Sequence, residues 1–253
     1  MSSGGAIARF LHDLHGRLLI PGVGRPVVGW LGVGMLLLGI SGLVLWWPHR
    51  GQWKQALTIK ARAKGYRFHR DLHGAVGFWT LSVFILVSFT GVYIAFPQSL
   101  SALLGLPAAG PAGIPPQAAG APAGPGATLA DYFVLANAAV PDGEPYSAML
   151  PFRPGMGTRV ALAYPGMGEG APAILATIDT ASGVVSEIRD PRTYSAGELF
   201  HVWQRPLHMG LGWGPIWKFL VFVSGFLPLL FAITGVSMWL IKRRNRRPMQ
   251  AAS

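Results

Sequence analysis

Residues Leu207 to Leu240 read LHMGLGWGPIWKFLVFVSGFLPLLFAITGVSMWL, and this stretch decides the fold. It opens with His208 and closes with a Thr-Gly pair and a tryptophan. A similar stretch, LHGRLLIPGVGRPVVGWLGVGMLLLGISGLVLWW, runs from Leu14 to Trp47 and matches His15 with His208 when the two are aligned without a gap. We interpret the pair as one unit used twice, a membrane helix with a histidine near its entry. The alternative is two unrelated membrane helices that agree by composition alone.

The composition is that of a membrane protein. The chain has 253 residues, of which 51% are hydrophobic and 12% are charged, whereas a soluble domain carries roughly 25% charged residues. Three segments, about residues 27–47, 74–97 and 217–241, are long and apolar enough for a bilayer, which takes about 20 residues to cross. The first lies too far from the N-terminus to be a signal peptide. We therefore expect a mainly α membrane protein with three transmembrane helices in a lipid bilayer.

The basic residues predict an orientation. The net charge is +11, but the lysines and arginines gather beside the apolar segments, so we expect no nucleic-acid partner. By the positive-inside rule, the loop 48–72 and the C-terminus are cytoplasmic, and the long loop 98–214 is periplasmic. This predicts a multi-pass membrane protein whose outer side, in a bacterium, is the periplasm. The chain has no cysteine, which excludes disulfides, thiolate haem ligands and cysteine-bound iron–sulfur clusters.

The chain divides into four parts by composition. These are an N-terminal membrane region (1–105), a Pro/Gly/Ala linker (106–127), an outer domain (128–195), and an interfacial helix with the third span and a basic tail (196–253). The outer domain starts with a helix near Thr128 and continues with extended stretches, the last of which has a hairpin turn at Ser182-Gly183. We expect a small α+β domain between the second and third spans. It contains no histidine, so we interpret it as a binding or sensing module.

All seven histidines lie near the ends of the predicted spans, where ionisable residues are functional candidates. Scarce carboxylates and absent cysteines disfavour zinc, calcium and magnesium sites. A b-type haem needs only two neutral imidazoles, one on each face of the ring, and two facing helices can supply them. The repeat offers His15 and His208 as axial ligands of an outer haem. The alternative is a pair of interfacial histidines hydrogen-bonded to lipid or backbone.

His73 precedes the second span at its cytoplasmic end and is the candidate ligand of an inner haem, so we expect one or two haem b groups. Its partner is open. His49 and His69 are the inner candidates, but His69 shares a helix face with His73, which leaves His49 as the on-chain residue with suitable geometry.

A [S/T]-G pattern recurs in all three spans. It occurs at Ser41-Gly42, Thr90-Gly91 and Thr234-Gly235. Small residues in lipid let another helix, or a flat group, approach closely. Helix packing alone is the alternative explanation.

These motifs resemble the PepSY-associated transmembrane helix family. The motifs are HDLH before a span ending SGLVLWWP, RDLHGAVGFW before a span ending FTG, and PLHMGLGWG before a span ending ITGVSMWL with a basic tail. The outer domain resembles a PepSY module in its order of helix and strands. The resemblance implies a bacterial inner-membrane protein, similar to haem-containing ferric-siderophore reductases, with axial ligation by His15, His208 and His73. The family usually has a further N-terminal span, which is where the partner of His73 would be expected. Either a missing span or a partner subunit completes a four-helix bundle and pairs with His73, or the protein holds only the outer haem.

The leading hypothesis is an oxidoreductase that passes electrons from an unknown donor to a ferric siderophore, or another iron chelate, at the periplasmic face. The alternative is a non-enzymatic membrane anchor whose PepSY-like domain binds or restrains a periplasmic partner such as a peptidase. A third hypothesis, a subunit of an iron-uptake transporter, ranks last because the spans lack an inward-facing charged pathway.

Overall fold

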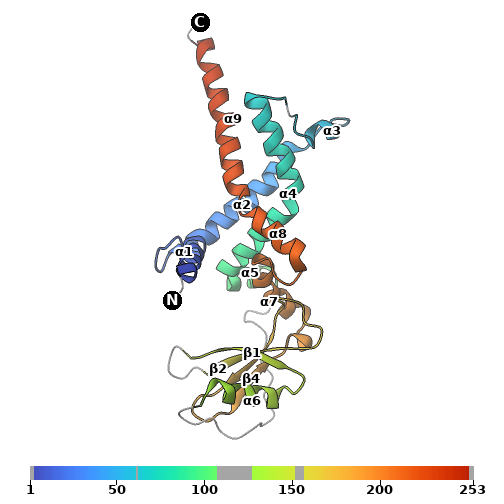
Figure 1. Cartoon of the computed structure of the whole chain (residues 1–253). Helices are drawn as coiled ribbons and strands as arrows, with labels where there is room; N and C mark the ends of the chain where they lie inside the picture. The colour runs from blue at the N-terminus through green and yellow to red at the C-terminus, as the bar shows by residue number, and fades with distance from the viewer. Residues whose placement is uncertain (1–2, 61, 107–126, 152–156, 251–253) are drawn as a thin grey trace. The chain divides into compact units, whose positions relative to one another are not determined.

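The computed structural model describes residues 3–60, 62–106, 127–151 and 157–250, and these form two units (Figure 1). The membrane unit comprises residues 1–97, 208–210 and 215–253, and the sheet unit comprises residues 98–207 and 211–214. Most of the predicted linker, residues 107–126, lies outside the described residues.

The long elements that the structure describes in the membrane unit are helices. Its helices are α1 (Ser3–Arg17), α2 (Gly24–Trp46), the short α3 (Trp53–Ala56), α4 (Gly65–Ala95), α8 (Gly214–Ser224) and α9 (Leu227–Gln250). Within the described residues, three helical segments are long and apolar enough to cross a membrane, namely Gly24–Trp46, Gly65–Ala95 and Gly214–Asn245. The prediction of three transmembrane helices is confirmed.

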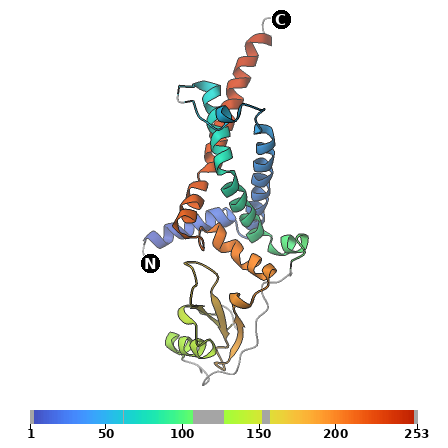
Figure 2. The ribbon, with the colours of Figure 1, turned by 90° about the vertical axis from the view of Figure 1, so that its right-hand side faces the viewer.

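Helix α4 is the centre of the membrane unit, because α2 and α9 both pack against it (Figure 2). Helices α2 and α4 run antiparallel and touch through glycines. A Cβ atom on Gly29 would lie 2.4 Å from the ring of Phe96, and one on Gly74 would lie 2.6 Å from the indole of Trp46. Glycine is required at both places because the facing side chains occupy that space.

The third span is interrupted. Helix α8 ends at Ser224 and α9 begins at Leu227, so that Pro228 is the second residue of the new helix. Proline has no N–H, and its ring clashes with the carbonyl of the residue four positions earlier. The break therefore falls just before Pro228.

The sheet unit is a four-stranded antiparallel meander with one helix on it. Its elements are α5 (Pro97–Leu103), α6 (Leu129–Ala139), β1 (Glu144–Met149), β2 (Thr158–Ala163), β3 (Ile174–Ile178), β4 (Val185–Arg189), a 3-10 turn η1 (Pro191–Thr193) and α7 (Ala196–His208). The strands lie in the order β1-β2-β3-β4. The core consists of apolar residues from α6 and from β2, β3 and β4: Tyr132, Leu135, Ala136, Val140, Val160, Leu162, Ile174, Ala176, Ile178 and Val185. This confirms the small α+β domain between the second and third spans.

Local signals set the ends of these elements. Thr128 and Asp131 form a reciprocal capping box at the start of α6, which satisfies backbone N–H groups that have no partner within the helix. Between β3 and β4, Asp179 Oδ1 accepts from the backbone N–H of Ser182 at 2.8 Å, and Gly183 has a φ of 69°. The predicted hairpin turn is thus present. The first of the predicted extended stretches is strand β1, which ends at Met149.

Candidate functional site

His15 and His208, which the repeat assigns to equivalent positions, lie next to each other in the membrane unit. His15 is near the end of α1, and His208 is the last residue of α7. Their ring centres are 5.9 Å apart, and the ring planes differ by 27°. His15 is exposed, whereas His208 is partly buried. We call the region around this pair the His15 end of the membrane unit.

Hydrogen bonds from α4 hold the His208 ring. Its Nδ1 atom lies 3.0 Å from the carbonyl oxygen of Val87 and 3.0 Å from the hydroxyl oxygen of Thr90. A carbonyl can only accept, so Nδ1 carries the proton and Nε2 keeps its lone pair. Burial lowers the pKa of His208, the bond with Val87 acts in the opposite direction, and neighbouring His15 lowers the pKa further. His208 is therefore a neutral imidazole at neutral pH, the form that binds a metal.

Gly91 makes room for this ring. A Cβ atom at residue 91 would lie 3.0 Å from Cε1 of His208. Any larger residue would push the ring away from Thr90, because that distance is shorter than ordinary van der Waals contact. The Thr-Gly pair of α4 thus has two separate roles, since the threonine binds the imidazole and the glycine admits it.

The same arrangement recurs around His73, near the other end of α4. The Nδ1 atom of His73 lies 2.7 Å from the hydroxyl oxygen of Thr234 in α9. The ring of Phe231 lies 5.0 Å away, centre to centre, and a Cβ atom on Gly235 would lie 3.9 Å from Cε1 of His73. At 1.5 Å per residue, His73 and Thr90 are about 25 Å apart along α4. The two histidine sites are therefore separate.

The third [S/T]-G pair differs from the other two. The hydroxyl of Ser41 donates to the carbonyl of Leu37 at 2.7 Å, but no histidine contacts it in the part of the chain that the structure describes. A Cβ atom on Gly42 would meet nothing within 4 Å. The Ser41-Gly42 pair thus has the hydroxyl bond to its own helix but no imidazole beside it among the described residues.

Neither of the two proposed inner partners reaches His73. His49 is exposed in the segment after α2, and the ring of His69 lies 5.7 Å from that of Phe68. The structure describes all three histidines and brings neither His49 nor His69 into ring contact with His73. The Nδ1 atom of His69 is buried, and no hydrogen-bond partner for it is found among the described residues.

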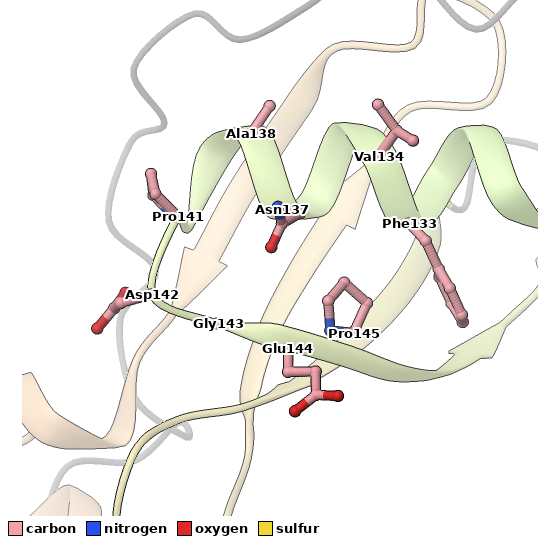
Figure 3. Close-up of a pocket in the computed structure, with 9 residues that line it drawn as sticks. All are labelled: Phe133, Val134, Asn137, Ala138, Pro141, Asp142, Gly143, Glu144 and Pro145. Carbon is pink, nitrogen blue, oxygen red and sulfur yellow. The ribbon is translucent and has the colours of Figure 1, made fainter.

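The sheet unit has a groove of about 710 Å³ between the second half of α6 and residues 141–145 (Figure 3). Phe133 and Asn137 of α6 lie on one side of it, and Asp142 and Glu144 lie on the other. Strand β1 is at an edge of the sheet, so one row of its backbone groups has no partner strand. Asp142 is bound by Arg192, whose guanidinium group also holds Asp190 at 2.7 Å.

Comparison with known proteins identifies the family of this chain. The profile of the PepSY-associated TM region matches residues 1–242. The chain belongs to this family. An uncharacterised protein of Pseudomonas aeruginosa is 38% identical over 82 residues, which is 32% of this chain and 20% of that protein. Because the match spans only a fifth of that relative, it shows nothing of the relative's activity as a whole.

Within this PepSY-associated TM protein, the His15 end can be compared with a pair of axial haem ligands. If each coordinating nitrogen lies about 2 Å from an iron, and each ring adds roughly 1 Å, two ligands that point at the iron along one line have ring centres roughly 6 Å apart. The ring centres of His15 and His208 are 5.9 Å apart, with the ring planes at 27°. The anchored Nδ1–H of His208 is the usual arrangement of a metal-bound histidine. His73 offers one anchored imidazole, and so one axial ligand.

Other metal chemistry has less support at these sites. In the described ranges, no three His, Cys, Asp or Glu residues gather as a metal-binding group. His12 is exposed on α1, and His201 belongs to the sheet unit. The PepSY-associated TM protein therefore offers paired or single imidazoles rather than a carboxylate-rich site.

The sequence alone does not identify the threonine hydroxyls as histidine partners. The [S/T]-G pattern predicts close approach alone, and Gly91 has that role. A signal was present, because a hydroxyl residue precedes the glycine in every span. The histidines that the threonine hydroxyls contact are 118 and 161 positions away along the chain. A single sequence does not reveal contacts between residues so far apart.

Proposed function

We propose that this protein is a haem-binding electron-transfer protein of a bacterial inner membrane, acting as a reductase of ferric siderophores or similar iron chelates. The observation that carries the proposal is the facing pair His15 and His208, with one ring held through Nδ1 and the two ring centres 5.9 Å apart. This set of groups suits axial ligation better than acid–base or nucleophilic catalysis.

The residues of the chain would act as ligands and as walls. His15 and His208 would each supply an imidazole nitrogen to the iron, and the carbonyl of Val87 fixes the orientation of the His208 ring. Bound haem supplies reversible one-electron chemistry at its iron. Burial lowers the pKa of His208 and so favours its neutral, metal-binding form. Exposed His15 leaves one side of the site open to solvent, where a chelate can approach.

Reduction suits the release of iron. One electron converts the ferric ion of a chelate to the ferrous ion, which oxygen ligands hold less tightly. The electron comes from a donor yet to be identified. The proposed site of reduction is the His15 end, which the positive-inside rule assigns to the periplasmic face.

A visible spectrum of the purified protein tests the proposal. Protein expressed with a supply of haem should show a Soret band, and a pyridine-haemochrome assay should count one or two haem b groups per chain. His15→Ala and His208→Ala should each abolish the haem at the His15 end. His12→Ala, on the same helix as His15 and exposed, is the matched control and should keep it. Wild-type protein without a Soret band overturns the proposal.

The groove of the sheet unit favours a second candidate function. A PepSY-like domain with an open groove beside an edge strand could hold an extended peptide segment of a periplasmic partner. A membrane anchor of this kind needs no haem. It predicts that a variant lacking His15, His208 and His73 complements a deletion strain as well as wild type does. Val134→Arg, a change at an exposed residue that lines the groove, should then fail to complement.

A further inference from the structure

The hydroxyl of each threonine that contacts a histidine also lies within hydrogen-bond distance of carbonyl groups in its own helix. The hydroxyl of Thr90 donates to the carbonyls of Leu86 at 2.9 Å or Val87 at 3.0 Å. The hydroxyl of Thr234 donates to Leu230 at 2.8 Å or Phe231 at 3.3 Å. A hydroxyl has one hydrogen and two lone pairs, so a threonine that donates its hydrogen to the helix carbonyl accepts a hydrogen bond from the imidazole. The carbonyl of Val87 requires this arrangement at His208, because a carbonyl can only accept from Nδ1, and we assign the same arrangement to His73.

Each threonine thus selects one tautomer. With the proton at Nδ1, the free lone pair is at Nε2 in both His208 and His73. That nitrogen lies at the far side of the ring from the threonine, so the available ligand atom points away from the helix that holds the ring.

Back-bonding of a threonine to its own helix does not explain the contact. Thr80, also in α4, donates to the carbonyl of Val76 at 2.8 Å and contacts no histidine. Ser41 in α2 does the same with Leu37. The hydroxyl is already satisfied in these cases. Thr90 and Thr234 form the same bond within their helices, but each also contacts a histidine and is followed by a glycine.

We infer that Thr90 and Thr234 are positioning residues for the ligand histidines His208 and His73, each acting from a neighbouring helix. This inference rests on the proposed haem function. A hydrogen bond at Nδ1 fixes the ring and raises the basicity of Nε2, which tightens the bond to a metal and favours its oxidised state. In both sites a threonine hydroxyl thereby holds the ligand histidine through Nδ1. Among the described residues, a second imidazole, that of His15, lies beside His208 but not beside His73.

The two histidines differ in how many hydrogen bonds hold the Nδ1 atom. His208 keeps its bond to the Val87 carbonyl if Thr90 is lost. For His73, the hydrogen-bond partner of Nδ1 within the described residues is Thr234. Loss of the Thr234 hydroxyl should therefore have the larger effect.

The test uses the full-length protein in detergent with haem bound. Thr90→Val and Thr234→Val remove the hydroxyl at nearly constant shape, Thr90→Ser and Thr234→Ser retain it, and Thr80→Val is the matched control. Haem loss is followed by transfer to apomyoglobin, and the midpoint potential is followed by spectroelectrochemistry. We expect Thr234→Val to release its haem about 10- to 100-fold faster and to raise the midpoint potential of its site. Thr90→Val should do the same to a smaller extent, whereas both serine variants and Thr80→Val should match wild type.

Each outcome decides a different point. Haem in the wild type, with valine variants that match Thr80→Val in both measurements, overturns this inference and leaves the proposed function standing. Wild-type protein without haem overturns both. A single haem that survives His73→Ala overturns the Thr234 half. If a valine variant does not accumulate, the comparison of alanine with serine at that position takes its place, and serine that fails like alanine contradicts a role for the hydroxyl.

Discussion

The Nδ1 atom of His73 and the hydroxyl oxygen of Thr234 lie 2.7 Å apart, which joins α4 to α9 near one end of the membrane unit. Near the other end of α4, Thr90 and His208 are joined at 3.0 Å. In both pairs the threonine precedes a glycine, and the glycine is the residue beside Cε1 of the imidazole. The Thr-Gly pairs are therefore contact points for histidines as well as for helices.

Glycine-to-alanine substitutions at the three [S/T]-G pairs should have graded effects. A Cβ atom would lie 3.0 Å from the imidazole at Gly91, 3.9 Å from it at Gly235, and more than 4 Å from any neighbour at Gly42. Only the first is closer than ordinary contact. Gly91→Ala should displace the His208 ring and weaken haem retention at the His15 end, whereas Gly235→Ala should have a small effect and Gly42→Ala none. Haem occupancy after gel filtration measures this, and equal losses in all three variants would contradict it.

Much of the fold follows from features that are local in the sequence. A bilayer needs about 20 apolar residues, so the three spans can be read directly, and Pro228 marks the break before α9. The capping residues Thr128 and Asp131 and the turn at Gly183 act within a few positions of themselves. The last extended stretch resolves into β3 and β4 because of that turn.

The site is less accessible to sequence reasoning. The repeat assigns His15 and His208 to one end of two similar segments, and the structure brings their rings together. The threonine contacts depend on the rotation of α4 and α9 about their axes, which hydrophobic spans surrounded by lipid leave undetermined. The partner of His73 follows neither from the sequence nor from the contacts of His49 and His69. Ligation by these histidines stays a prediction.

The glycine contacts between α2 and α4 predict a stability difference within one helix. At Gly29 a Cβ atom would lie 2.4 Å from the Phe96 ring and 2.7 Å from the Cβ atom of Ala95, which has no rotamer to change. Gly29→Ala should therefore destabilise the membrane unit by about 1–3 kcal/mol, as overpacking does. Gly34→Ala is the control, since nothing lies within 4 Å, and alanine is up to about 1 kcal/mol better than glycine in a helix. Thermal unfolding followed by tryptophan fluorescence should give a lower Tm for the first variant only; a lower Tm for both would show that the contact with Phe96 is not the cause.

Single cysteines test the expected orientation without background, because the chain has none. Ala181 is exposed in the β3–β4 turn, and Gln55 is exposed in α3. If the loop 48–72 is cytoplasmic, a membrane-impermeant maleimide should label Ala181→Cys in intact spheroplasts and should label Gln55→Cys only after permeabilisation. The reverse pattern would place the His15 end and the proposed chelate site on the cytoplasmic side.

The ion pair between Asp142 and Arg192 predicts a pH dependence of the sheet unit. The hydrogen bond from Arg192 lowers the pKa of Asp142 below its ordinary value. A carboxyl group with a lower pKa in the folded state stabilises that state above its unfolded pKa of about 3.9, and this contribution is lost as the pH falls through the folded pKa. Asp142→Asn should therefore speed hydrogen exchange in peptides from α6 and the strands at pH 6. The difference from wild type should become smaller as the pH is lowered from 6 to 3, because the contribution of the charged carboxyl group declines below the unfolded pKa and is lost as the pH falls through the folded pKa. Exchange is measured by mass spectrometry on the full-length protein at both pH values. A difference of the same size at pH 3 would mean that the asparagine acts through packing rather than through charge.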